Sequence, residues 1–418
     1  MLSVNKKTVN TLSKNLMGAM IFIGIFTTSC QSSSNKNDST ANLPESSPAN
    51  VTTAAQNQDF AAQMQGLKKS LVEVLPLVLD PNQFNQEKNQ KVILEKVHKM
   101  RELSKNVKHI AVKDQKDPSI DFIAQAFTDD LARVEEGLSM GKKEFARYNL
   151  LNVTAYCIEC HTRTSTGPSF SSNDFEQTLK RLNGLERGEF LLATRQFDSA
   201  LKEFSQIIDE RLEQKSDFFI LDKAVRQSLA ITVKYLKDPK KSLLITDKLK
   251  NSVNTPYYLK QNALGWEIAI KDWMKEKPAK DNSVKAILKR CQQWEQSAQQ
   301  DQMTNLDHTG QIYYLRALSD LHLILPTKLT GDELGQALYL AGVGYDSMRD
   351  FSLWNLHEDY YESCIRKVPH STWSEKCYKR FEESAYFGFT GSSGIRIPDD
   401  VANRLAELKT LALRPESH

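Results

Sequence analysis

Apolar side chains recur every three or four residues along most of the chain, which is the spacing of one face of an α-helix. No stretch of any length has the strict alternation of apolar and polar residues that indicates a β-strand. In the first half, the helical pattern covers residues 59–79, 86–107, 117–138 and a stretch that begins after Gly141. Asp80-Pro81 ends the first stretch, and Asp117-Pro118-Ser119 opens the third. The pattern predicts an all-α fold.

The connections between these four stretches are short, which favours helices that run alternately up and down in a four-helix bundle. We expect this bundle to span residues 58–165. In that topology the first and fourth helices are antiparallel, so the start of the first helix lies near the end of the fourth.

Helical patterns continue through residues 174–390, after a stretch with Ser, Gly and Pro at 165–173. The spacing of a tetratricopeptide repeat, in which two antiparallel helices cross at small residues, is matched by Gly188, Leu191, Phe197, Ala200 and Phe204. Further helix pairs are predicted at 257–275 with 283–299 and at 310–325 with 334–348, followed by a unit at 354–368. This half resembles a helical-repeat domain, with a non-repeating helical domain as the alternative. A turn and a closing helix are expected in residues 391–418.

Residues 1–30 have the layout of a targeting segment: lysines at the start, an apolar core at residues 16–26, and small residues before Cys30. The apolar core is too short for a comfortable membrane span. The layout resembles a bacterial lipoprotein signal, which implies a lipid on Cys30. Ordinary cleavage and an uncleaved anchor are the alternatives, because Thr27 stands where that signal usually has Leu. Residues 31–57 are rich in Ser, Asn, Thr and Gln, and predict a disordered tether.

Length and charge add limits to this organisation. The chain has 418 residues, enough for two or three domains. Its 55 basic and 52 acidic residues nearly cancel and form no basic stripe, so we expect no nucleic-acid partner. The second half contains no G-x-S-x-G, H-E-x-x-H or P-loop motif. We therefore expect a binding or electron-transfer protein and not an enzyme.

The pentapeptide Cys157-Ile158-Glu159-Cys160-His161 has the C-x-x-C-H pattern of covalent haem attachment. In this pattern two thiols one helical turn apart form thioethers with haem, and the adjacent imidazole ligates the iron. The alternatives are a thioredoxin-like redox pair, half of a zinc site, and a chance occurrence of the pattern. A redox pair normally follows a strand, and a zinc site needs two further ligands at short spacing. The sequence has neither a predicted strand before the motif nor two further ligands at short spacing, so we expect one covalent haem c.

The first half of the chain resembles the cytochrome c-prime type of four-helix-bundle cytochrome, including its b-type relative. The resemblance rests on residues 59–64, the C-x-x-C-H motif and the helix spacing between them. It implies that Met64 is the second axial ligand of the iron, opposite His161. A Met on an apolar helix face is otherwise a core residue, which is how we interpret Met100. Arg163, just after the motif, is either a partner of a haem propionate or part of an ordinary linker.

The chain has six cysteines. Lipid accounts for Cys30 and haem for two more, which leaves Cys291, Cys364 and Cys377. An exported protein can keep disulfides, and Cys364 and Cys377 flank a predicted turn between two helices. A Cys364–Cys377 disulfide is therefore a candidate, the alternative being two buried thiols.

These features predict an exported mono-haem c-type cytochrome that is lipid-anchored at the periplasmic face of a bacterial cell envelope. Its expected activity is electron transfer, with the helical repeats docking a redox partner protein or a larger complex. A haem-based gas or redox sensor is one alternative. A repeat scaffold with a mainly structural haem is another.

Overall fold

The computed structural model describes the backbone of residues 49–114, 117–163, 175–301, 307–349, 353, 355–392 and 394–413. The all-α prediction is confirmed for these residues, in which the strands are limited to one hairpin of two-residue strands. The predicted signal peptide, Cys30 and the tether up to residue 48 lie outside the described residues. Residues Val51–His418 form one compact unit. Within the described residues, no helix is both long and apolar enough to cross a membrane.

The described residues of the N-terminal half form six helices, two of which begin at a capping aspartate. They are α1 (Ala49–Leu79), α2 (Pro81–Phe84), α3 (Glu87–Asp114), α4 (Pro118–Ser139), α5 (Lys143–Leu151) and α6 (Val153–His161). Asp80 caps α2 and Asp117 caps α4, each through a side-chain oxygen that accepts backbone N–H groups. The predicted boundaries at these two residues are confirmed. Helix α1 begins at Ala49, within the segment predicted as a tether.

The fourth predicted helix is interrupted at Asn152, which separates α5 from α6. The Asn152 N–H donates to the carbonyl of Asn149, 3.1 Å away, and so closes the helix by a three-residue turn. Helix α5 packs against α4, whereas α6 packs against both α4 and α8 (Gly184–Ala193) of the C-terminal half. The break at Asn152 therefore separates a helix that packs on α4 from one that also packs on the C-terminal half.

The C-terminal helices follow the predicted segments closely in position. They are α7 (Phe175–Leu179), α8 (Gly184–Ala193), α9 (Phe197–Gln214), α10 (Phe218–Leu229) with the π-helical turn η1 (Ala230–Tyr235), α11 (Pro239–Asn251), α12 (Tyr257–Lys275), α13 (Val284–Asp301), α14 (Gln311–Ile324), α15 (Gly331–Asp346), α16 (Leu356–Lys367), α17 (Thr372–Gly388) and α18 (Asp399–Ala412). The hairpin of β1 (Thr390–Gly391) and β2 (Gly394–Ile395) precedes α18. The first predicted pair is wrong, because α12 packs mainly against α11 and α13 against α14, whereas α14 and α15 of the second predicted pair do pack together.

Two close helix crossings require glycine. A Cβ atom at Gly188 of α8 would overlap the ring of Phe204 on α9. A Cβ atom at Gly342 of α15 would overlap the ring of Tyr361 on α16. The small residue expected at the crossing of the first C-terminal pair is therefore present and in contact.

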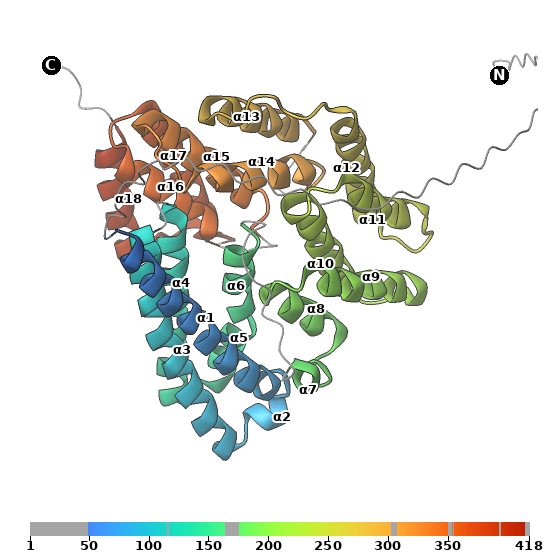
Figure 1. Ribbon diagram of the computed structural model, residues 1–418, viewed down its shortest axis with the longest axis vertical. Helices are drawn as coiled ribbons and strands as arrows, with labels where there is room; N and C mark the ends of the chain where they lie inside the picture. The colour runs from blue at the N-terminus through green and yellow to red at the C-terminus, as the bar shows by residue number, and fades with distance from the viewer. Residues whose placement is uncertain are drawn as a thin grey trace, which may run out of the picture. The chain divides into compact units, whose positions relative to one another are not determined.

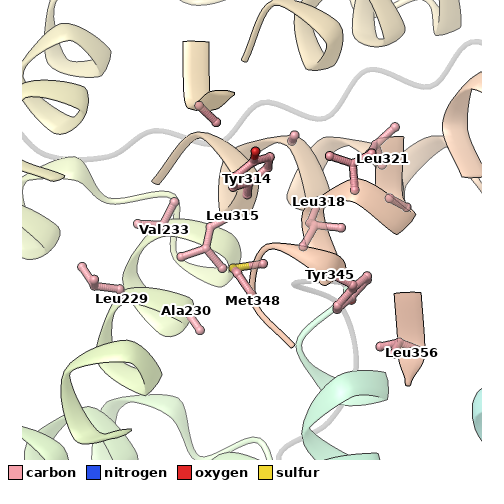
Figure 2. Packing of buried hydrophobic residues seen from close by; sticks show 14 of the residues in the cluster. Leu229, Ala230, Val233, Tyr314, Leu315, Leu318, Leu321, Tyr345, Met348 and Leu356 are labelled. Atoms are coloured by element: carbon pink, nitrogen blue, oxygen red, sulfur yellow. The ribbon is translucent and has the colours of Figure 1, made fainter. Parts of the chain in front are cut away.

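The cores of the two halves interlock. Ile123 of α4 and Ile158 of α6 belong to the large apolar cluster of the C-terminal helices, whereas Phe190 of α8 belongs to the cluster of the N-terminal helices. Figure 1 shows α6 between the N-terminal helices and α8. Figure 2 shows part of the C-terminal core, where Leu315 and Leu318 of α14 lie near Ala230 of η1. Such shared burial favours halves that unfold together.

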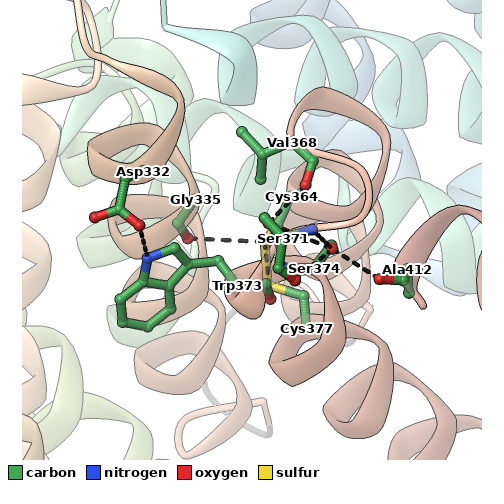
Figure 3. The surroundings of a disulfide bond; sticks show 9 residues. All are labelled: Asp332, Gly335, Cys364, Val368, Ser371, Trp373, Ser374, Cys377 and Ala412. Atoms are coloured by element: carbon green, nitrogen blue, oxygen red, sulfur yellow. Dashed lines mark hydrogen bonds between the residues drawn. A yellow bond between two sulfur atoms is a disulfide. The ribbon is translucent and has the colours of Figure 1, made fainter. Parts of the chain in front are cut away.

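Cys364 of α16 and Cys377 of α17 form a disulfide, with their Cα atoms 6.4 Å apart (Figure 3). The turn between these helices is held by Ser371, whose side chain caps α17. The Ser374 hydroxyl donates to the carbonyl of Ala412, 3.0 Å away, and so attaches α18 to the same corner. Cys291 is a buried free thiol.

Candidate functional site

Cys157, Cys160, His161 and Met64 all line one pocket, whose empty volume is about 780 Å³ including space open to solvent. Apart from these four, the lining consists of Leu67, Lys68, Leu71, Met100, Ser104, Ile120, Ile123, Ala124, Phe127, Tyr156, Ala193 and Thr194. The structure thus brings together residues from the start of the first predicted helix and the end of the fourth, as the sequence analysis expected.

Helical periodicity explains why the walls of this pocket are apolar. Helix α1 contributes Met64, Leu67, Lys68 and Leu71, which share one face because they are three or four residues apart. Helix α4 contributes a similar apolar face that includes Phe127. The ring of Phe127 contacts the ring of Tyr156, with centroids 5.4 Å apart. The pocket is therefore suited to a mostly apolar ligand.

The imidazole of His161 is held by a residue of the C-terminal helices. Its Nδ1 lies 2.5 Å from the carbonyl oxygen of Ala193, at the end of α8. Burial lowers the pKa of His161 to about 4, so the ring is neutral at pH 7. A neutral ring that donates from Nδ1 carries its lone pair on Nε2, which is the arrangement of a metal-ligating histidine.

Arg195 fixes the end of α6 from the same side. Its Nη1 donates to the carbonyl oxygen of His161, 2.5 Å away, and so satisfies one carbonyl left unpaired at the helix end. The Arg195 guanidinium also lies over the rings of Phe197 and Tyr235, at 5.4 and 5.8 Å from their centroids. Arg195 has a φ of 62°, in the left-handed region. Its side chain links the end of α8 to the motif.

The two thiols lie in an environment that keeps them protonated. Burial raises the pKa of Cys157 to about 12 and that of Cys160 to about 11. Both cysteines are free and line the pocket. A thioredoxin-like redox cysteine has a lowered pKa, so this environment does not favour the redox-pair alternative.

The residues present fit a c-type haem. Two neighbouring thiols, a neutral imidazole and a thioether are set in apolar walls, and Lys68 is a cation beside them for a carboxylate group. The described residues contain no group of three or more His, Cys, Asp or Glu residues placed to hold a metal ion. The zinc alternative thus lacks its further ligands within this part of the chain.

Other candidates lie elsewhere. Arg163 is buried outside the pocket, where it donates to the Ser119 hydroxyl and lies 3.4 Å from Asp117. It is therefore not placed to meet a haem propionate in this pocket. Met100, interpreted from sequence as core, is buried and also lines the pocket.

Two contributions were missed by the sequence analysis. Lys68 lies four residues after Met64, and helical spacing alone places it on the same face. Ala193 acts through its backbone carbonyl, for which its side chain carries no sequence signal. No protein-family profile, no curated protein and no solved structure matches this chain.

Proposed function

We propose that this protein is a mono-haem c-type cytochrome that transfers electrons. The observation that carries the proposal is the shared pocket of Met64, Cys157, Cys160 and His161, with His161 Nδ1 bonded to the Ala193 carbonyl. A chance C-x-x-C-H segment has no reason to line an apolar pocket together with a thioether, with its imidazole already held by a hydrogen bond.

Each residue has a defined role in this proposal. Cys157 and Cys160 would attach the haem through thioethers, and His161 and Met64 would hold its iron through Nε2 and sulfur. Haem supplies an iron that exchanges single electrons, and the protein supplies position and environment. The Ala193 carbonyl holds the imidazole, while the apolar walls exclude water.

The finer architecture is also a proposal. Helices α1, α3, α4 and the interrupted pair α5–α6 correspond to a cytochrome c-prime-type bundle. The C-terminal helices correspond to a degenerate tetratricopeptide-like array, for which the glycine crossing at Gly188 is the best support.

We further propose that the mature chain is lipid-anchored through Cys30 at the periplasmic face of a bacterial cell envelope, where it meets a redox partner protein. Wild-type protein is then expected in the membrane fraction, and Cys30→Ser is expected in the soluble fraction. Mass spectrometry of the mature N-terminus checks the lipid directly. An unmodified Cys30 in membrane-bound protein would contradict the lipid and favour an uncleaved anchor.

Absorption spectra of the purified protein in both redox states test the haem proposal. We expect one covalent haem per chain and low-spin, six-coordinate bands. Met64→Ala should convert these bands to high-spin ones, because the thioether is lost. Met100→Ala tests the other thioether of the pocket, and Met140→Ala is a control because Met140 is exposed.

The outcomes separate the alternatives. Loss of the low-spin bands in Met64→Ala, but not in Met100→Ala or Met140→Ala, supports Met64 as an axial ligand. A high-spin wild-type spectrum with ready binding of carbon monoxide would overturn electron transfer in favour of a gas sensor. Absence of covalent haem after expression with a haem-attachment system would overturn the proposal altogether.

A further inference from the structure

The second face of α6 carries a buried carboxylate that the haem proposal does not use. Glu159, between the two cysteines of the motif, is buried and does not line the pocket. The hydroxyl of Tyr345, on α15, donates to Glu159 Oε2 over 2.9 Å. The Nζ atom of Lys234, in η1, lies 3.8 Å from the same oxygen. Glu159 is therefore held by two side chains of the C-terminal helices.

Lys234 is itself buried and placed by several contacts. Its Nζ donates to the Thr162 hydroxyl over 3.1 Å and lies 5.8 Å from the centre of the Tyr345 ring. Its backbone carbonyl accepts from the hydroxyl of Ser319, on α14, over 2.8 Å. Burial lowers the pKa of Lys234 to about 8, so the ammonium is still mostly protonated at pH 7.

These contacts come from helices that are far apart in the sequence. Helix α6 meets η1 at Lys234, α15 at Tyr345 and the end of α8 at Ala193. A small cavity next to Glu159 is lined by α10, η1, α14 and α15 as well. The face that these helices share is therefore occupied by a helix of the same chain.

Polar contacts of this kind specify position better than apolar ones. A buried ion pair contributes little net stability compared with well-packed apolar residues, but it strongly disfavours any arrangement that separates the two charges. The Glu159–Lys234 pair and the Tyr345 hydrogen bond are satisfied when α6 sits at one height and rotation. That rotation also turns Cys157, Cys160 and His161 towards the pocket, because residue 159 lies on a different face of the same helix.

We propose that Lys234 and Tyr345 are positioning residues for the haem site, which hold α6 through Glu159 so that His161 and the two cysteines face the pocket. The C-terminal helices are on this view a part of the cytochrome, and not only a module for docking a partner. The proposal rests on the haem assignment above.

Equilibrium unfolding of the full-length holoprotein tests it with two native probes. The five tryptophans are Trp266 and later residues, so their fluorescence reports only on the C-terminal half. The Soret band reports on the haem pocket. In wild type we expect both probes to give the same urea midpoint. In Lys234→Met we expect the Soret midpoint to fall below the tryptophan midpoint, and the low-spin fraction without urea to decrease.

Controls separate positioning from general destabilisation. Lys241→Met removes an exposed ammonium of α11 and should change neither probe. Tyr345→Phe removes only the hydroxyl that reaches Glu159 and should act in the same direction as Lys234→Met, but less. Adding Glu159→Gln to Lys234→Met removes the buried carboxylate charge that Lys234 no longer balances, and should restore part of the low-spin fraction.

Two results would overturn the inference while leaving the haem assignment intact. One is a wild-type protein whose two probes unfold separately, with a spectrum that Lys234→Met leaves unchanged. The other is a Lys234→Met variant in which both midpoints fall equally and the spectrum does not change. A wild type without a Soret band would instead overturn the haem assignment. In that case, hydrogen exchange of the α6 amides is compared between wild type and Lys234→Met. Faster exchange in the variant would show that Lys234 holds α6 even without haem, and equal exchange would show that it does not.

Discussion

The two faces of α6, a helix of nine residues, lie in different surroundings. The face with Cys157, Cys160 and His161 borders an apolar pocket with space for a large ligand. The face with Glu159 borders a compact polar cluster that involves Lys234 and Tyr345. We propose from this difference that the first face receives the haem, whereas the second fixes the helix that presents it.

Buried polar contacts also hold the residue just beyond the end of α6. Arg163, just beyond α6, lies in a second polar group with Asp117 and Ser119 at the start of α4. Both groups are buried, so a substitution in either should lower the free energy of unfolding and leave the surface of the protein little changed. Substitutions on the pocket face should instead have large effects on ligand binding and small effects on the free energy of unfolding.

The largest expected effect falls on the pocket face. Cys157→Ser with Cys160→Ser should abolish covalent haem, because no thiol remains to form a thioether. Mass spectrometry and the absorption of denatured protein measure this directly. Cys291→Ala alters the remaining buried thiol and should leave haem content unchanged. Full haem retention in the double variant would remove the basis for a ligand-receiving face.

Removing the carboxylate should have the next largest effect. Glu159→Ala leaves Lys234 buried without its acidic partner, and we expect the free energy of unfolding to fall by about 3 kcal/mol in urea denaturation. Glu144→Ala, on the exposed side of α5, should change it by less than about 0.5 kcal/mol. Equal effects of the two substitutions would mean that the polar face does not hold α6.

The polar face also predicts a pH dependence, because the Nε2 atom of His322, on α14, lies 3.3 Å from the Tyr345 hydroxyl. Burial, with Arg163 and Lys234 nearby, keeps the pKa of His322 well below its usual value of 6.5. As pH falls below 6.5, the unfolded chain takes up a proton that the native state does not, so stability falls by up to about 1.4 kcal/mol per pH unit. His322→Gln should be less stable at pH 7 but lose less on acidification to pH 5.

Denaturation in urea at several pH values measures this effect. His98→Gln is the matched control, because the side chain of His98 is 64% exposed. An acid-side slope in His322→Gln identical to that of wild type would show that His322 takes up a proton as readily in the native state as in the unfolded chain.

The smallest expected effect concerns the support of Lys234. Ser319→Ala removes the hydroxyl that donates to the Lys234 carbonyl and should cost about 1 kcal/mol. Ser139→Ala removes an exposed hydroxyl that donates to the carbonyl of Glu135, and should be close to neutral. If both variants have wild-type stability, the Ser319 contact adds nothing to the polar face.

Much of this organisation was predictable from local patterns. Asp80-Pro81 and Asp117-Pro118 marked helix boundaries because a capping carboxylate and a proline act within a few residues. The position of Met64 near the start of the predicted first helix, combined with an up-and-down topology, placed it near the motif, although α1 itself begins earlier, at Ala49. The break at Asn152 was not predicted, because apolar periodicity continues across it and the alternative packing of α6 lies outside the segment.

The sequence by itself determined an all-α protein and a chemically specific pentapeptide, because helical periodicity and a covalent attachment pattern are properties of neighbouring residues. Only the tertiary structure decided what surrounds that pentapeptide. The Ala193 carbonyl, Lys234 and Tyr345 reach α6 from positions 32 to 186 residues further along the chain. Such contacts depend on how the C-terminal helices pack, and no local pattern encodes them.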